Sequence, residues 1–179
     1  MISVPLNPFL FPTICNFKKY VGKNKSFEKL MFDDYPYLEW SYENLKNSSD
    51  RGKIGILLEL GEKMKPVGNC KGKDCTNIVQ KICFYRANYR TSAGRSVNTD
   101  FRGFCSKCAR DFTQRSDEGK HQIVDIKFSS ALSFDTVTDR KSFMEELKYC
   151  LGGPSQKTNE AAVGFFHKIF DQVYNNFPA

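Results

Sequence analysis

The chain has 179 residues, of which 40% are hydrophobic and 14% aromatic, and its formal net charge is +7 at pH 7. This composition excludes a disordered tail, because such chains carry few aromatic residues and cannot bury enough apolar surface to fold. The sequence also has no run of the roughly 18 consecutive apolar residues that a membrane-spanning helix needs. We therefore expect a soluble, globular protein that does not bind membranes.

The N-terminal segment VPLNPFLFPTICNF has three prolines between residues 5 and 12, which exclude a regular helix. We expect an extended arm that packs on the same chain, or alternatively on a protein partner. The segment lacks the features of a secretory signal, and the seven cysteines are an odd number, which argues against a disulfide framework. These observations predict a reducing, intracellular location in the cytoplasm or the nucleus.

Three segments before residue 65 carry local signals. Residues 26–32 can form a short helix, and residues 53–60 (KIGILLEL) form an apolar run that predicts a strand. Residues 33–45 contain Trp40, the only tryptophan, in an acidic and aromatic patch that either makes an internal contact or binds a protein partner. We assign residues 1–65 to the arm and the first part of an α+β scaffold.

Cys70, Cys75, Cys105 and Cys108 form a C-x4-C pair and a C-x2-C pair, separated by 29 residues. Paired spacing of this kind presents four thiolates to one tetrahedral Zn²⁺ ion, and the intervening residues suffice for a β-hairpin. The sequence therefore predicts a zinc module at residues 66–112 with one structural Zn²⁺ per chain, although four thiolates can also hold iron. Cys83 could replace one of the four ligands, but packing in the apolar run IVQKICFY is its expected role.

The segment GFCSKCARDF, with its upstream C-x4-C pair, resembles the knuckles of zinc-ribbon and treble-clef proteins. The resemblance covers about 45 residues. It implies that the four cysteines are the metal ligands, and that the module binds nucleic acid or a protein of a nucleic-acid machine.

Positive charge is concentrated on this module. Residues 65–115 contain eleven Lys or Arg residues and three Asp or Glu residues, a net charge of +8 in a chain whose total is +7. Arginine can fork onto phosphate and tyrosine can stack on an unpaired base, so RNA or single-stranded DNA is a more suitable partner than duplex. The predicted contact residues of both types lie along the hairpin: Tyr85, Arg86, Tyr89, Arg90, Arg95 and Arg102. The alternative is a solvated hairpin whose tyrosines pack on the rest of the protein.

Residues 113–179 are expected to complete the scaffold with a strand and two helices. Residues 122–128 alternate between polar and apolar, which predicts the strand. Residues 138–151 and 158–177 have apolar residues at helical spacing, and Gly152, Gly153 and Pro154 separate them. The predicted fold is α+β, with a small mixed or antiparallel sheet, the four-cysteine module inserted between strands 53–60 and 122–128, and C-terminal helices.

The chain shows no motif typical of catalysis, and four thiolates leave a zinc ion no open position for water. We therefore expect a non-enzymatic, zinc-stabilised nucleic-acid-binding protein with a regulatory or accessory role. One alternative is a protein-interaction adaptor or inhibitor without nucleic-acid contact. Another is a small metal-dependent nuclease, with His121 as base and Asp125 or Asp111 as metal ligand.

Overall fold

A computed structural model describes residues 7–10, 12–91, 94–114 and 120–175, and for 88–91, 94–98, 120 and 175 it describes the backbone alone. The chain divides into two compact units. Unit 1 combines Met1–Met64 with Gly153–Ala179, and unit 2 is Lys65–Gly152. Across the described ranges, no helix is both long enough and apolar enough to cross a membrane.

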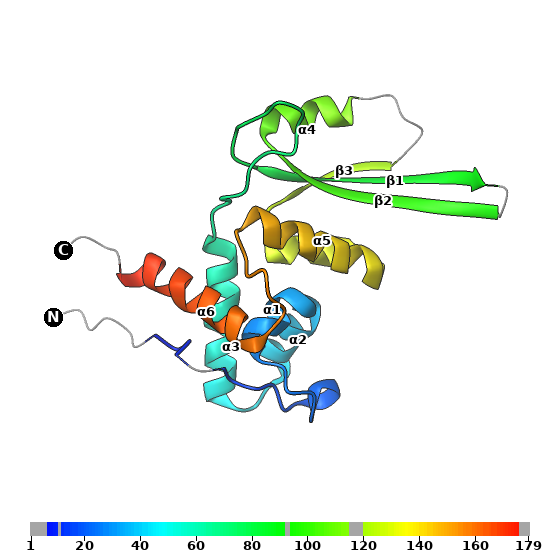
Figure 1. Ribbon diagram of the computed structural model, residues 1–179. Helices are drawn as coiled ribbons and strands as arrows, with labels where there is room; N and C mark the ends of the chain where they lie inside the picture. The colour runs from blue at the N-terminus through cyan, green and yellow to red at the C-terminus, as the bar shows by residue number, and fades with distance from the viewer. Residues whose placement is uncertain (1–6, 11, 92–93, 115–119, 176–179) are drawn as a thin grey trace. The chain divides into compact units, whose positions relative to one another are not determined.

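Unit 1 is built mainly of helices (Figure 1). In chain order they are the 3-10 helix Lys18–Tyr20, α1 (Phe27–Asp33), α2 (Tyr35–Asn44), α3 (Ser48–Lys63), α6 (Asn159–Phe170) and the π-helix Asp171–Asn175. Polar side chains cap three of them: Ser26 accepts the Lys29 N–H, Asn47 accepts those of Ser49 and Asp50, and Thr158 accepts that of Ala161. The predicted helix at 26–32 is confirmed. The helix predicted at 158–177 is found as α6, which Thr158 caps, and the chain continues as the π-helix to Asn175; positions 176 and 177 lie outside the described residues.

The prediction of a strand at residues 53–60 is wrong, because this run lies within helix α3. Its buried residues Ile54, Leu57 and Leu60 are spaced by three, which places them on one face of a helix. The Asn47 cap starts the helix upstream of the run. The four-cysteine module is therefore not inserted between two strands, as the sequence had suggested.

The core of unit 1 is aromatic and includes the described part of the N-terminal arm. Phe9 is fully buried, with its ring 6.1 Å from that of Phe166 and 5.9 Å from that of Phe170. Asn7 donates hydrogen bonds to the His167 carbonyl and to the Asp171 carboxylate. Burial of one Phe side chain contributes about 1.5–3 kcal/mol, so Phe9 anchors the arm within its own chain.

Unit 2 contains a three-stranded antiparallel sheet in the order β2-β1-β3. Its elements are β1 (Lys81–Thr91), β2 (Gly94–Phe104), α4 (Ser106–Thr113), β3 (Lys120–Asp125), the 3-10 helix Phe128–Ser133 and α5 (Val137–Cys150). The predicted hairpin between the cysteine pairs is confirmed, as are the strand and helix expected after it. The chain is therefore α+β, as predicted.

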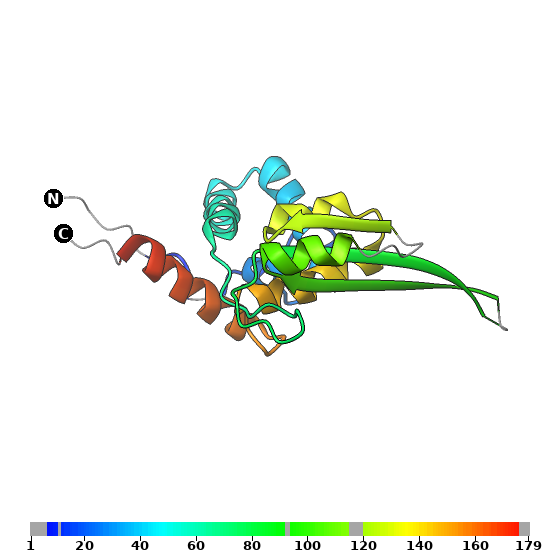
Figure 2. The same ribbon diagram turned by 90° about the horizontal axis from the view of Figure 1, so that it is seen from above.

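Helix α4 covers one face of the sheet and α5 covers the other (Figure 1). Alternation along β1 divides the side chains between the faces: Phe84 packs with Phe134 toward α5, whereas Tyr85 packs with Phe112 of α4. Within the described residues, strand β3 pairs with residues 81–86 of β1. Beyond this point β1 and β2 continue as a two-stranded ribbon, which runs past the end of α4 in Figure 2.

A buried ion pair in unit 1 provides a test of this core. The Glu28 side chain is fully buried, and the Lys53 ammonium lies 2.8 Å from its carboxylate. Replacing Lys53 by Met should lower the free energy of unfolding of unit 1 by about 3–5 kcal/mol, because a buried carboxylate is left without its cation. Trp40 lies in unit 1, so urea unfolding followed by its fluorescence measures the change.

The matched control is Lys63→Met, which breaks the exposed ion pair with Glu59. It should cost about 1 kcal/mol or less. The double variant Glu28→Met/Lys53→Met should regain most of the lost stability. Equal effects of Lys53→Met and Lys63→Met would contradict the assignment of a buried pair.

Candidate metal centre

The four cysteines of the two predicted pairs meet at one point. Cys70 and Cys75 lie on the loop before β1, Cys105 is the N-cap of α4, and Cys108 lies in the first turn of α4. All four sulfur atoms lie within 4.8 Å of one another, and those of Cys75 and Cys105 are 3.8 Å apart. Tetrahedral Zn–S bonds of about 2.3 Å place sulfur atoms about 3.8 Å apart. The cluster can therefore hold a metal ion such as zinc.

Short backbone hydrogen bonds build the first knuckle. The Cys70 N–H donates to the Asn77 carbonyl, and the Cys75 N–H donates to the Gly72 carbonyl. Asp74 adopts the left-handed φ of 55° that the tight turn requires. Two further N–H groups, from Gly72 and Cys105, donate to the Cys70 sulfur at 3.3 and 3.2 Å. Such donors stabilise a thiolate, which is the form that binds metal.

The surroundings shift the pKa values of three of the thiols, those of Cys70, Cys105 and Cys108, in different directions. Hydrogen bonding from the Cys108 backbone N–H lowers the pKa of Cys105 to about 6, so this thiol is mostly ionised at neutral pH. Burial raises the pKa values of Cys70 and Cys108. Metal capture must therefore displace protons from these two cysteines, and affinity should fall as pH falls.

Cys83 lies beside the four-sulfur cluster without being part of it. Its side chain is fully buried and packs with Cys70, Phe104, Cys105 and Ala109. Burial raises the pKa of Cys83 to about 12, which keeps it a neutral thiol. Among the described residues, the group with metal-binding geometry consists of Cys70, Cys75, Cys105 and Cys108.

Glu146 ties the cysteine loop to helix α5. Its side chain is buried, and its carboxylate accepts the Gly103 N–H at 2.6 Å and the Lys71 ammonium at 2.5 Å. The Lys71 ammonium also lies 4.4 Å from the centre of the Tyr149 ring. The role of Glu146 was not predicted from the sequence. The available signal was an acidic side chain on the same helical face as Phe143 and Leu147.

A surface cavity of about 470 Å³ opens beside the cluster. Its wall combines one cysteine of the cluster with a glycine, cations, an acid and two aromatic rings: Lys71, Gly72, Lys73, Arg102, Phe104, Cys108, Asp111 and Phe112. The rings of Phe104 and Phe112 lie 5.3 Å apart. The cavity is thus cationic and aromatic at the same time.

The predicted nucleic-acid contact residues separate into three groups. Arg102 is exposed at the cavity and pairs with Asp100 at 2.6 Å. Arg86 instead pairs with the buried Asp139 at the start of α5, and Tyr85 packs against Phe112 and His121. The side chains of Tyr89, Arg90 and Arg95 lie outside the described residues, although their backbone belongs to the ribbon.

Two residues of the nuclease alternative, His121 and Asp125, lie apart on strand β3. The His121 ring lies 4.9 Å from that of Tyr85 and 5.4 Å from that of Phe112, and its two nitrogens have no hydrogen-bond partner within the described ranges. Asp125 pairs with Lys81 and lies four residues along the same strand, about 13 Å from position 121. Asp111 lies at the cavity. His121 as base is therefore separated from Asp125 along β3, and its combination with Asp111 stays a prediction.

Comparisons of the chain with protein-family models, with curated proteins and with solved structures find no match.

Gly72 provides a test of the knuckle. A Cβ atom at this position would lie 2.5 Å from the Cys108 sulfur and 3.2 Å from the Cys108 Cβ. Gly72→Ala should therefore displace a ligand and weaken zinc affinity by roughly 10–100-fold, as supporting residues of metal sites do. Competition with a chromophoric chelator measures the affinity. Gly52→Ala is the control, because a Cβ there meets nothing within 4 Å; equal affinities for the two variants would refute this packing of Gly72 against Cys108.

Proposed function

We propose that the protein binds RNA or single-stranded DNA through unit 2, and that one structural Zn²⁺ ion held by Cys70, Cys75, Cys105 and Cys108 fixes the binding surface. Four thiolates close the coordination sphere of zinc, which suits a structural ion better than a catalytic one. Such a site needs a reducing compartment, since oxidation would join the thiols.

The observation that carries the proposal is the cavity beside the four sulfurs. Lys73 and Arg102 are exposed on its wall and offer positive charge to phosphate. Phe112 is half-buried and offers aromatic surface to a base, whereas Phe104 is buried and packs against Phe112. Lys71 also lies there, but Glu146 and Tyr149 already engage its ammonium.

The binding surface proposed here differs from the one expected from sequence. Arg86 and Tyr85 support the sheet through Asp139 and Phe112, so we no longer assign them to nucleic acid. Arg102 stays, and Lys73 joins it. Tyr89, Arg90 and Arg95 remain proposed contacts. They belong to the part of β1 and β2 that lies beyond the residues of β1 paired with β3.

Metal content is the first measurement. Elemental mass spectrometry of the purified protein should give one zinc per chain, and Cys105→Ser and Cys108→Ser should lose the metal and unfold unit 2. If the protein instead contains iron and absorbs visible light, the proposed metal is an iron–sulfur centre in place of zinc. Absence of stoichiometric metal would overturn the metal assignment.

Nucleic-acid binding is tested by fluorescence anisotropy with a labelled oligouridine over a series of salt concentrations. For Lys73→Ala/Arg102→Ala we expect weaker binding, and a log–log salt slope shallower by about 1.4, since each lost contact with a single strand removes about 0.7. The control Lys65→Ala/Lys141→Ala removes two exposed charges of the same unit outside the cavity. Wild-type protein without salt-sensitive binding would overturn the proposal and favour a protein-interaction adaptor.

A further inference from the structure

Unit 1 has a basic surface of its own on the loop before α1. Residues 17–25, FKKYVGKNK, contain four lysines in nine positions, and we call this segment the lysine loop. Lys18, Lys19 and Lys23 are exposed, and Lys25 is half-buried. The loop is inconspicuous in the sequence, because acidic residues of neighbouring segments offset its charge in the total.

A single buried tyrosine gathers the ammonium groups of the loop. Those of Lys19, Lys23 and Lys25 lie 5.3, 5.6 and 5.7 Å from the centre of the Tyr20 ring. The Tyr20 side chain is 8% exposed, and its hydroxyl donates to Asp34 at 2.6 Å. Cation–π attraction and this anchor hold like charges close together.

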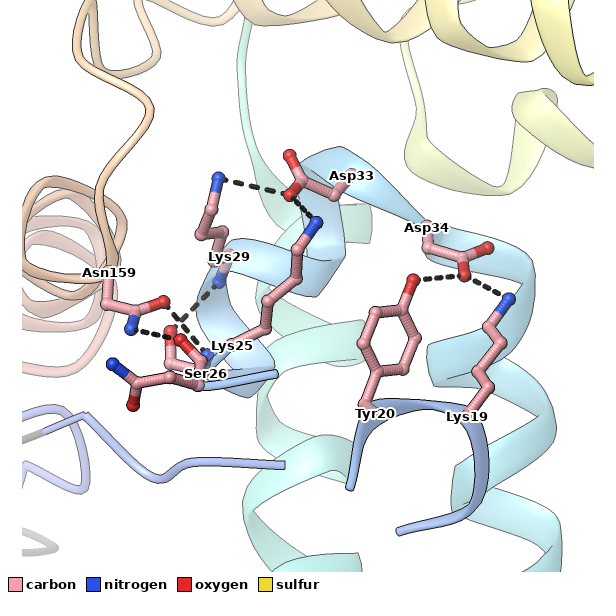
Figure 3. Close-up of polar contacts among 9 residues, drawn as sticks. Lys19, Tyr20, Lys25, Ser26, Lys29, Asp33, Asp34 and Asn159 are labelled. Carbon is pink, nitrogen blue, oxygen red and sulfur yellow. Dashed lines mark hydrogen bonds and ion pairs between the residues drawn. The ribbon is translucent and has the colours of Figure 1, made fainter. Parts of the chain in front are cut away.

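Two carboxylates offset part of the charge. Figure 3 shows Lys19 with Tyr20 at Asp34, and Lys25 with Lys29 at Asp33. The corresponding nitrogen–oxygen distances are 2.5 Å from Lys19, 2.5 Å from Lys25 and 3.0 Å from Lys29. The described residues offer Lys18 and Lys23 no carboxylate, so the surface keeps an excess of positive charge.

The backbone of the lysine loop is held in a defined conformation. Lys18, Gly22 and Asn24 have left-handed φ values of 51°, 72° and 47°. Asn159, at the start of α6, donates to the Asn24 carbonyl at 2.8 Å and accepts the Ser26 N–H at 2.9 Å (Figure 3). Left-handed conformations of residues with side chains are unfavourable and persist where the surroundings impose them. The lysines are thus presented by a fixed scaffold.

An exposed aromatic stack adjoins these lysines. Trp40 is 39% exposed, and its ring lies 5.8 Å from that of Phe17 at an interplanar angle of 20°. The Lys18 ammonium lies 5.9 Å from the Phe17 ring, and that of Lys19 lies 4.7 Å from the Tyr37 ring, which packs on Trp40. Phosphate-binding charge and a stacking surface therefore occur together.

We infer that the lysine loop and Trp40 form a second contact surface for single-stranded nucleic acid, with phosphates at Lys18, Lys19 and Lys23 and a base on Trp40. The ligand class rests on the proposed function, whereas the surface is separate from the one in unit 2. Cations next to an exposed aromatic ring are the combination by which proteins bind unpaired strands without sequence preference. An acidic protein would use the lysines but would leave the stack of Trp40 on Phe17 without a role.

The test uses the full chain and a labelled oligouridine of about 20 nucleotides, longer than the site of a single module. For Lys18→Gln/Lys23→Gln we expect roughly tenfold weaker binding and a salt slope shallower by about 1.4. For Trp40→Leu we expect binding weaker by roughly 5- to 100-fold with an unchanged salt slope, because stacking involves no counterion. The control Lys46→Gln/Lys168→Gln removes two exposed charges elsewhere in unit 1 and should leave both quantities unchanged.

The outcomes separate this inference from the proposed function. If the lysine-loop and Trp40 variants bind like the control while Lys73→Ala/Arg102→Ala weakens binding, the inference is overturned and the proposed function stands. If the reverse holds, the inference is supported and the cavity assignment fails. Wild-type protein that binds no oligouridine overturns both. If the lysine-loop and Trp40 variants bind oligouridine like the control but lose binding of the wild-type protein to phosphatidylserine vesicles, the loop is reassigned to a lipid surface and the inference is overturned.

Discussion

The convergence of two cysteine pairs is the constraint around which unit 2 is organised. Cys70 and Cys105 are 35 residues apart in the chain, yet the Cys105 N–H donates to the Cys70 sulfur at 3.2 Å. The antiparallel pairing of β1 with β2 makes this possible, since it returns the chain to its starting point. Helix α4 then begins at Cys105, so its first turn supplies the fourth sulfur. A metal ion at this point would join the loop, the hairpin and the helix.

Ion pairs divide the basic residues of this chain into two kinds. Lys71 and Arg86 reach the buried carboxylates of Glu146 and Asp139, and they stabilise the packing of the sheet against α5. Charges of this kind are poor candidates for ligand contacts, because leaving a buried carboxylate unpaired costs several kcal/mol. Lys73 and Arg102 are exposed, and Asp100, which pairs with Arg102, is not buried. A count of basic residues along the sequence cannot make this distinction.

The two units carry similar chemistry on different scaffolds. In unit 2, cations and phenylalanine rings surround a cavity beside the four sulfurs, whereas in unit 1 a tyrosine and two aspartates order a lysine loop next to an exposed tryptophan. Both surfaces join exposed positive charge to aromatic rings.

Local signals in the sequence determined the helix at 26–32, the two C-terminal helices and the grouping of four cysteines, because helical periodicity and ligand spacing act over a few residues. Alternation likewise predicted the strand at 122–128, which the structure places at Lys120–Asp125. The run at 53–60 misled, since a short apolar segment fits a strand or a buried helix equally well until its upstream cap is recognised. Tertiary structure alone decided the partners of Arg86 and Glu146, which lie 53 and 43 residues from the groups they bind. It also decided the anchoring of the lysine loop by Asn159, which lies 135 residues from Asn24. Long-range pairings of this kind depend on how the elements pack, and the periodicity of a single segment does not predict them.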